Sequence, residues 1–140
     1  MEITEIEEQI VSEFENYEDW LDKYNYLIEL GKSLPIIEES EKTDNNLITG
    51  CQSKVWLQAN YDNGNIIFKA DSDAIITKGI VGLLVRVLSN QKAEDIMNAK
   101  LEFIDKIGLR EHLSPTRSNG LNSMIRQMKL YALAYKTKYQ

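Results

Sequence analysis

Apolar residues recur every three or four positions in the first third of the chain, as they do along one face of an α-helix. One such stripe consists of Ile3, Ile6, Ile10, Val11 and Phe14. A second stripe consists of Trp20, Tyr24, Leu27, Ile28 and Gly31. Thr4 and Glu7 have the spacing of a capping box, which predicts that the first helix begins at Thr4. Pro35 ends the second helical pattern.

The middle of the chain changes to the pattern of a β-hairpin. Residues 38–46 are polar and predict a loop, whereas residues 55–61 and 65–70 are rich in types that favour strands. Residues 62–65 between these strands tolerate positive φ angles and predict the turn. Because two strands alone rarely form a stable layer, a third strand is expected, and residues 99–103 are its candidate.

Helical periodicity returns in the second half of the chain. It predicts helices at 74–90, 93–98 and 117–138, with an interrupted helical segment at 104–112. Gly79 and Gly82 lie inside the first of these helices and are expected to let it pack closely against the sheet. Helices around a small antiparallel sheet of about three strands define an α+β fold. The length of 140 residues fits a single domain over residues 1–140.

The chain is acidic, with a formal net charge of −6. An acidic surface repels phosphate groups, so nucleic acid is not an expected partner. The charge is uneven, because residues 1–45 hold 14 acidic and 3 basic side chains whereas residues 117–140 hold 5 basic and no acidic ones. The first interpretation is that both segments are solvated helix faces. The alternative is that one of them docks a protein partner.

The location of the protein is predicted from three features. A single cysteine excludes an intrachain disulfide. Residues 1–15 lack the basic start and apolar run of a signal peptide. The longest apolar region, residues 80–88, is interrupted by Arg86 and is too short to span a membrane. These features predict a cytoplasmic protein that has no membrane association.

Cys51 is the side chain with the clearest chemical potential. It lies between the polar loop and the first strand and follows Gly50, which allows a tight turn or a mobile backbone. On such a loop a thiol can be presented to another molecule. A small buried residue without reactivity is the alternative, since free cysteine is often buried. Gln52 and Ser53 follow directly, and the residues alone leave both interpretations open.

Structural roles are favoured for the other polar candidates. The only histidine, His112, lies in an apolar run, so a structural role is preferred to a Cys–His pair with Cys51. Asp71 and Asp73 precede a predicted helix, which favours N-capping over catalysis or metal binding. For Arg117 a salt bridge to one of these aspartates is favoured over anion binding. Trp20 and Trp56 are expected in the core.

Four segments of the chain resemble segments that characterise the SufE family, and they occur in the same order. They are LIELGKSLP at 27–35, GCQSKVW at 50–56, DSDA at 71–74 with Lys78 and Gly79, and HLSPTRSNGL at 112–121. Cys51 matches the sulfur-accepting cysteine of that family. The residues Gly50, Gln52, Ser53, Asp71, Asp73 and Arg117 lie in the matching segments and are expected to support its loop.

The resemblance implies a specific activity. A SufE protein takes sulfur from the persulfide of a cysteine desulfurase, stimulates that enzyme and passes the sulfur to a Suf scaffold for iron–sulfur cluster assembly. It is a carrier, not an enzyme, and it has no cofactor of its own, because the pyridoxal phosphate (PLP) belongs to the desulfurase. The fold is shared with IscU-type scaffolds, and the resting cysteine is expected in an apolar pocket.

Several alternatives stay open at this point. The desulfurase partner is SufS-like or, because a sister group of CsdE-type acceptors has nearly the same motif, CsdA-like. The protein is a monomer or a homodimer. Two other functions also compete with the carrier, namely a cluster scaffold and a stand-alone thiol protein such as a redox sensor. A scaffold needs several ligands for each cluster, whereas this chain supplies one thiolate.

Overall fold

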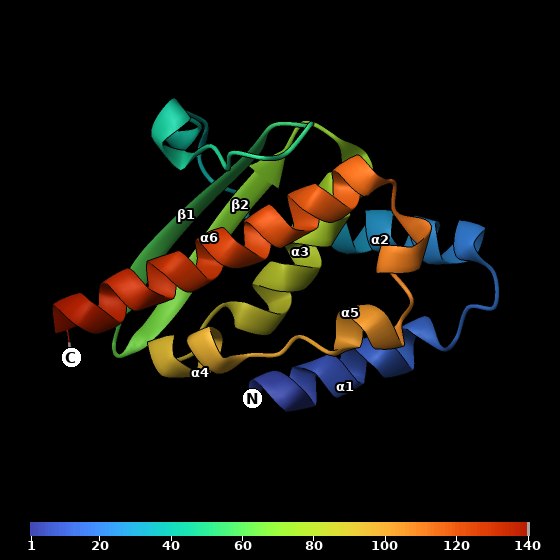
Figure 1. Ribbon diagram of the computed structural model, residues 1–140, viewed down its shortest axis with the longest axis horizontal. Coiled ribbons are helices and arrows are strands. Elements are labelled where there is room, and N and C mark those ends of the chain that lie inside the picture. The colour runs from blue at the N-terminus through green and yellow to red at the C-terminus, as the bar shows by residue number, and fades with distance from the viewer. Residues whose placement is uncertain (140) are drawn as a thin grey trace.

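Six α-helices and one two-stranded antiparallel sheet make up residues 1–139, the part of the chain that the computed structural model describes (Figure 1). The helices are α1 (Ile3–Phe14), α2 (Trp20–Lys32), α3 (Ile75–Leu88), α4 (Ala93–Asn98), α5 (Phe103–Lys106) and α6 (Pro115–Tyr139). The strands are β1 (Val55–Asp62) and β2 (Asn65–Ser72). Single 3-10 turns occur at Glu39–Glu41, Asp44–Asn46 and Arg110–His112. The predicted α+β class is confirmed.

The predicted hairpin is present and slightly longer than expected. Asn63 and Gly64 form its turn with φ angles of 54° and 90°, which the right-handed twist of a two-residue hairpin requires. In the register that follows, Leu57 pairs with Ala70 and Trp56 pairs with Asp71. Because side chains alternate across a strand, the first pair faces the core and the second faces outward.

The prediction of a third strand at residues 99–103 is wrong. Leu101 has a φ angle of +55°, which regular strand geometry excludes, and α5 begins at Phe103. The alternation in this segment reflects irregular chain that buries Ala99, Leu101 and Phe103 in turn. Single bridges extend the two-stranded sheet instead, where Ile36 lies beside β2 and Leu47 lies beside β1.

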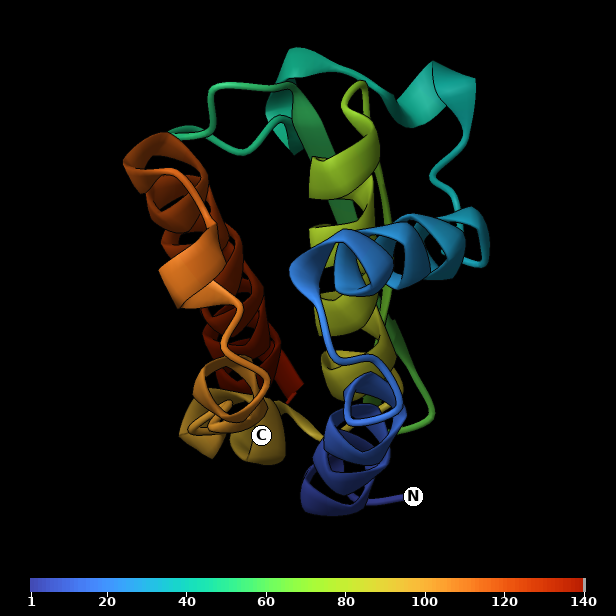
Figure 2. The ribbon, with the colours of Figure 1, turned by 90° about the vertical axis from the view of Figure 1, so that its right-hand side faces the viewer.

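Helix α3 is the central element of the fold. It packs on β2, and it lies between α6 on one side and α1 and α2 on the other (Figure 2). Its apolar residues are buried almost all round, as expected for a helix that has neighbours on several faces. Helix α6 also contacts β1, where the Tyr135 hydroxyl donates to the carbonyl of Ala59 at 2.8 Å.

The glycines of α3 serve a different contact from the predicted one. Gly79 packs against the backbone of α2 at Leu27 and Gly31 and not against the sheet. A Cβ atom at Gly79 would overlap the carbonyl oxygen of Leu27, so the two helices cross at a distance that only glycine permits. At Gly82 a Cβ atom would have ordinary contacts, the nearest at 3.7 Å.

Two further predictions need correction. Helix α1 begins one residue before Thr4, and the carboxylate of Glu5 accepts a hydrogen bond from the N–H of Glu2 at 3.2 Å. The capping pair is therefore displaced by two residues from the predicted one. Trp20 packs half-buried against the core, whereas Trp56 lies on the outer face of the hairpin, beneath the ammonium group of Lys42 at 5.5 Å.

Within residues 1–139 no helix has both the length and the hydropathy that a membrane crossing needs.

Candidate functional site around Cys51

Cys51 lies on the loop at the end of the sheet where α3 and α6 both begin (Figure 1). Gly50 precedes it with a φ angle of +91°, a conformation that side-chain-bearing residues rarely adopt. A Cβ atom at Gly50 would also lie 2.5 Å from the Ser123 hydroxyl oxygen of α6. The backbone angle therefore favours glycine at this position, whereas rotation of the Ser123 side chain could relieve the contact with α6.

The thiol of Cys51 is half-buried against the first turns of α6. Its Sγ atom lies 3.6 Å from the carbonyl oxygen of Gly120, to which the S–H group can donate a weak hydrogen bond. Gly120 has no side chain, and a Cβ atom there would lie 3.4 Å from Sγ. Burial raises the pKa of the Cys51 thiol. The resting cysteine is therefore a protonated and weakly nucleophilic thiol.

A small cavity of about 70 Å³ adjoins the sulfur atom. Its lining consists of Cys51, Gln52, Ser53, Thr77, Ile80, Thr116, Arg117, Gly120 and Met124. Ser53 is half-buried and Gln52 is exposed, so both predicted loop residues belong to the cavity although they differ in exposure. The lining combines apolar residues of α3 and α6 with three hydroxyl-bearing residues and one arginine.

The downstream end of the loop is fixed to the start of α3. The N–H of Lys54 donates to Oδ1 of Asp73 at 3.0 Å, and the N–H of Asp73 donates to the carbonyl of Lys54 at 3.2 Å. The hydroxyl of Ser72 donates to the same carbonyl at 2.9 Å. Asp73 is therefore hydrogen-bonded to the end of the loop, but it does not cap α3 with its side chain, which corrects that prediction.

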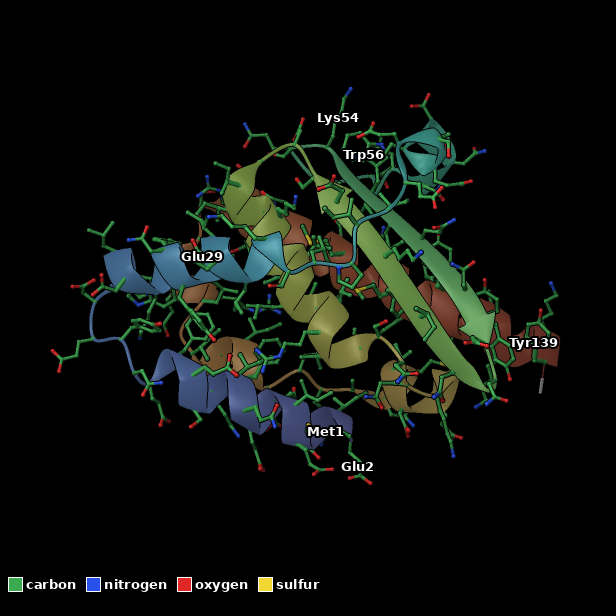
Figure 3. The ribbon with its side chains drawn as sticks, turned by 180° about the vertical axis from the view of Figure 1, so that it is seen from behind. Met1, Glu2, Glu29, Lys54, Trp56 and Tyr139 are labelled. Atoms are coloured by element: carbon green, nitrogen blue, oxygen red, sulfur yellow. The ribbon has the colours of Figure 1, made fainter. Side chains whose placement is uncertain are left out.

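Asp71 is buried on the outer face of the hairpin and also does not cap α3. It forms ion pairs with Lys42 at 2.7 Å and with Lys78 at 3.3 Å. Burial alone would raise the pKa of Asp71, but hydrogen bonds from Lys42, from the N–H of Ser72 and from Lys78 outweigh it, and the net shift is downward. Figure 3 shows Trp56 and Lys54 at the end of the hairpin where β1 begins, next to the turns of residues 39–46.

Arg117 lies at the cavity and not in the predicted salt bridge. Its side chain is exposed, and no ion pair joins it to Asp71 or Asp73 within the described residues. The two aspartates are occupied by Lys42, Lys78 and the backbone of Lys54 instead. The salt bridge to Asp71 or Asp73 that the sequence favoured is therefore not formed, and Arg117 lines the cavity beside Cys51 instead.

His112 has the structural role that the sequence predicts. Its ring stacks on Trp20 with centroids 3.9 Å apart, and Nδ1 lies 3.0 Å from the carbonyl oxygen of Gly108. The Tyr24 hydroxyl donates to its carbonyl oxygen. His112 is not among the residues that line the Cys51 cavity, so it does not form a Cys–His pair.

Among the described residues that line the cavity, Cys51 is the one thiol and none of its neighbours is a histidine or a carboxylate that could act as a general base. Within residues 1–139 no group of three His, Cys, Asp or Glu side chains suits a metal ion. A single sulfur with these neighbours can exchange with another sulfur compound once it is deprotonated and exposed.

Several residues of the site were not predicted from the sequence. Thr77, Ile80 and Met124 line the cavity, and Lys42 holds Asp71 although it lies 29 positions away in sequence. Gly120 gave one usable signal, because a glycine inside a predicted helix is unfavourable unless something packs against it. Ion pairs such as Lys42–Asp71 leave no local pattern.

The fold and the site together define a small α+β protein that presents one half-buried cysteine on the loop before a β-hairpin. A family model described as SufE, Fe-S metabolism associated domain, matches residues 8–132, and the chain belongs to this family. The predicted family resemblance is confirmed.

Related proteins agree with this assignment. An uncharacterised SufE-like protein of Rhizobium meliloti is 40% identical over 127 residues, which is 87% of this chain and 91% of the relative. The SufE-like protein 1, chloroplastic/mitochondrial, of Arabidopsis thaliana is 36% identical over 94% of this chain but over only 36% of its own length. A solution structure of a hypothetical protein from Thermus thermophilus matches the fold with a TM-score of 0.78 at 19% identity, covering 94% of this chain and 96% of that one.

Proposed function

We propose that this protein accepts sulfur on Cys51 from a cysteine desulfurase and carries it towards iron–sulfur cluster assembly. The observation that supports this function most is the position of the only thiol. Cys51 is held against Gly120 on a glycine-containing loop, at the edge of a cavity large enough for a small group beside Sγ. Membership of a family associated with Fe–S metabolism agrees with the proposal.

The transfer step begins with Cys51 leaving its contact with Gly120. Exposure to water removes the cause of its raised pKa, so the thiol loses its proton more readily. The thiolate attacks the outer sulfur of the persulfide on the desulfurase cysteine. The S–S bond of the donor breaks, a new S–S bond forms on Cys51, and the donor cysteine leaves as a thiolate that takes up a proton. No external oxidant or reductant is needed.

Each partner has a defined part in this proposal. The desulfurase is SufS-like or CsdA-like, and it supplies the PLP chemistry that releases sulfur from L-cysteine. Removal of its persulfide frees it for another turnover, which accounts for the stimulation. The recipient is a scaffold of the Suf system. A thiol that must stay reduced between transfers fits the predicted cytoplasmic location.

The side chains around Cys51 have supporting roles. Asp73 and Ser72 hold Lys54, so the loop can move upstream of a fixed point. Arg117 lines the cavity, where its positive charge can attract the negative charge of a bound persulfide. Gly50 supplies the backbone freedom that movement of the loop requires.

The decisive experiment is intact mass measurement under non-reducing conditions after incubation with a desulfurase and L-cysteine. We expect a gain of one or more sulfur atoms on the wild-type chain and none on Cys51→Ser. A SufS-like and a CsdA-like enzyme, tested separately, identify the partner by the faster gain. An unmodified chain beside an active desulfurase of each type would refute the proposal.

The same samples distinguish the competing functions. A scaffold predicts iron–sulfur absorbance after anaerobic reconstitution, near one cluster per chain. A redox sensor predicts rapid oxidation of Cys51 by peroxide in the isolated protein, which the protonated resting thiol argues against. The carrier predicts neither result.

A further inference from the structure

A second surface feature lies along α6, C-terminal to the Cys51 cavity. It is a groove of about 490 Å³ between α6 and the segment that follows α4. Its lining consists of Met97, Lys100, Leu101, Arg110, Asn122, Ile125, Arg126, Lys129, Leu130 and Leu133. The Cys51 site uses none of these residues.

The groove has an apolar floor that the fold leaves uncovered. Leu130 and Leu133 are 48% and 46% exposed, although α6 buries other residues of similar size such as Leu121 and Met128. Asn122, Arg126, Leu130 and Leu133 are spaced by four, four and three residues, so they form one stripe on the helix. Large exposed apolar side chains that gather in a groove indicate a binding surface.

The walls of the groove are basic. Four cations and no acidic side chain line it, on a chain whose net charge is −6. Lys129 donates to the carbonyl of Ala99 at 2.6 Å, and Arg110 donates to Asn122 at 2.6 Å. Within residues 1–139, Lys100 and Arg126 form no ion pair. Their charges are therefore available to a ligand.

We propose that this groove binds an acidic amphipathic helix of a partner protein. Such a helix places apolar side chains over Leu130 and Leu133 while its flanking carboxylates meet Lys100 and Arg126. The match of an apolar floor with basic walls specifies both properties of the ligand. The groove is long enough to follow three turns of α6, from Asn122 to Leu133.

Other occupants fit the groove less well. A second copy of this chain that offers the same face would place cations against cations. The acidic helix α1 cannot serve as the ligand in another copy, because its apolar stripe, Ile3, Ile6, Ile10 and Phe14, is already buried. Nucleic acid needs cations but no exposed leucines. A membrane favours a convex or flat apolar face over a groove.

The position of the groove separates docking from chemistry. Gly120, which contacts Cys51, and Leu130 lie ten residues apart on the same helix, about 15 Å along its axis. A partner bound in the groove is therefore close to the Cys51 loop without covering it. The groove does not depend on the sulfur-acceptor proposal, since none of its residues takes part in that chemistry.

Fluorescence anisotropy with a designed peptide tests the proposal. The probe is a labelled synthetic helix with leucines at positions i, i+3 and i+7 and glutamates on both flanks, and the control is a peptide of the same composition in scrambled order. Binding is measured to the full chain at low salt. We expect saturable binding of the patterned peptide, weaker binding of the scrambled one, and a loss of affinity as salt increases.

Matched variants locate the binding site on the protein. Arg126→Glu is expected to weaken binding roughly tenfold, and the double change Leu130→Ser with Leu133→Ser to weaken it at least as much. Lys138→Glu makes the same charge change on the exposed end of α6, outside the groove, and should leave affinity unchanged. Circular dichroism confirms that each variant is folded.

Three results would overturn the proposal. The first is absence of saturable binding to the wild-type chain. The second is an equal effect of Arg126→Glu and Lys138→Glu, which would assign any binding to general charge. The third is that vesicles containing phosphatidylglycerol, or single-stranded DNA, bind more tightly than the peptide and lose that binding in the groove variants.

Discussion

The sulfur atom of Cys51 lies 3.6 Å from the carbonyl oxygen of Gly120, a residue 69 positions further along the chain. This contact links the loop before the hairpin to the first turns of α6. A Cβ atom at residue 120 would touch Sγ at 3.4 Å, an ordinary contact, so the sulfur leaves room there for a methyl group but is in the way of a larger side chain. The exposure of Cys51, and with it the pKa of the thiol, therefore depends on a residue of the last helix.

Enlarging residue 120 should expose the thiol. The branched side chain of Gly120→Val would occupy the space of Sγ, so we expect Cys51 to turn outward and to react with iodoacetamide roughly ten times faster. Gly120→Ala is the control, because its Cβ atom would have an ordinary contact with Sγ at 3.4 Å. An equal rate in all three proteins would show that Gly120 does not shield the sulfur.

The reactivity of Cys51 should depend on pH in a way that reflects its burial. Because the pKa of the thiol is raised, the folded protein keeps Cys51 protonated at pH values where a peptide thiol is already ionised. The rate of alkylation, followed by intact mass, should therefore rise at a higher pH in the native protein than in urea. The prediction would be contradicted if the pH at the midpoint of the rise in alkylation rate were the same or lower in the native protein than in urea.

Asp71 should stabilise the fold at neutral pH but not in acid. Its pKa is lower in the folded protein than in the unfolded chain, so its contribution is complete above the unfolded pKa and disappears as the pH falls through the folded one. We expect Asp71→Asn to reduce the free energy of unfolding by about 1–3 kcal/mol at pH 7, because Lys42 and Lys78 lose their charged partner.

Urea unfolding at a series of pH values tests this prediction. The difference in the free energy of unfolding between wild type and Asp71→Asn should shrink below about pH 4, where the carboxylate of the unfolded chain begins to take up its proton while that of the folded protein is still ionised. Asp62→Asn, at the exposed end of β1, is the matched control and should change stability little at any pH. A difference that stays constant down to pH 2 would mean that the charge of Asp71 is not the cause.

The crossing of α2 and α3 gives a prediction with an internal control. Gly79→Ala would place a methyl group against the carbonyl oxygen of Leu27, and we expect it to destabilise the protein by about 2 kcal/mol or more. Gly82→Ala, one turn further on, has room for the methyl group and should be neutral or stabilising by up to about 1 kcal/mol. The denaturation midpoints of both variants test this prediction. Equal shifts of the two midpoints would contradict the close contact between Gly79 and Leu27.

The sequence predicts those parts of the fold that repeat locally. The stripes of Ile3 to Phe14 and of Leu121 to Ala132 gave their helices, and Asn63-Gly64 gave the hairpin turn. The segment at 99–103 misled because burial on alternate positions looks the same in a strand and in irregular chain, and only the positive φ angle of Leu101 separates them.

The site was predictable only in part for a similar reason. Cys51 is conspicuous as the single cysteine beside a glycine, and the family resemblance supplies its expected role. The partners of Asp71 and the free position of Arg117 depend on which loop folds over the hairpin, and that is decided by long-range packing. Capping was the local explanation for Asp71 and Asp73, and Lys42 and the backbone of Lys54 displaced it.

The loop around Cys51 also limits how far its sulfur can travel. Ile48 is paired with Val55 on one side and Lys54 with Asp73 on the other, and Cys51 lies three residues from each. A fully extended chain covers about 3.5 Å per residue, so the Cα atom of Cys51 stays within about 10 Å of both fixed points. Any molecule that exchanges sulfur with it must bring its reactive atom to this end of the hairpin. Cys51 can reach a donor cysteine at the bottom of a deep cleft only if the cleft admits the end of the sheet itself.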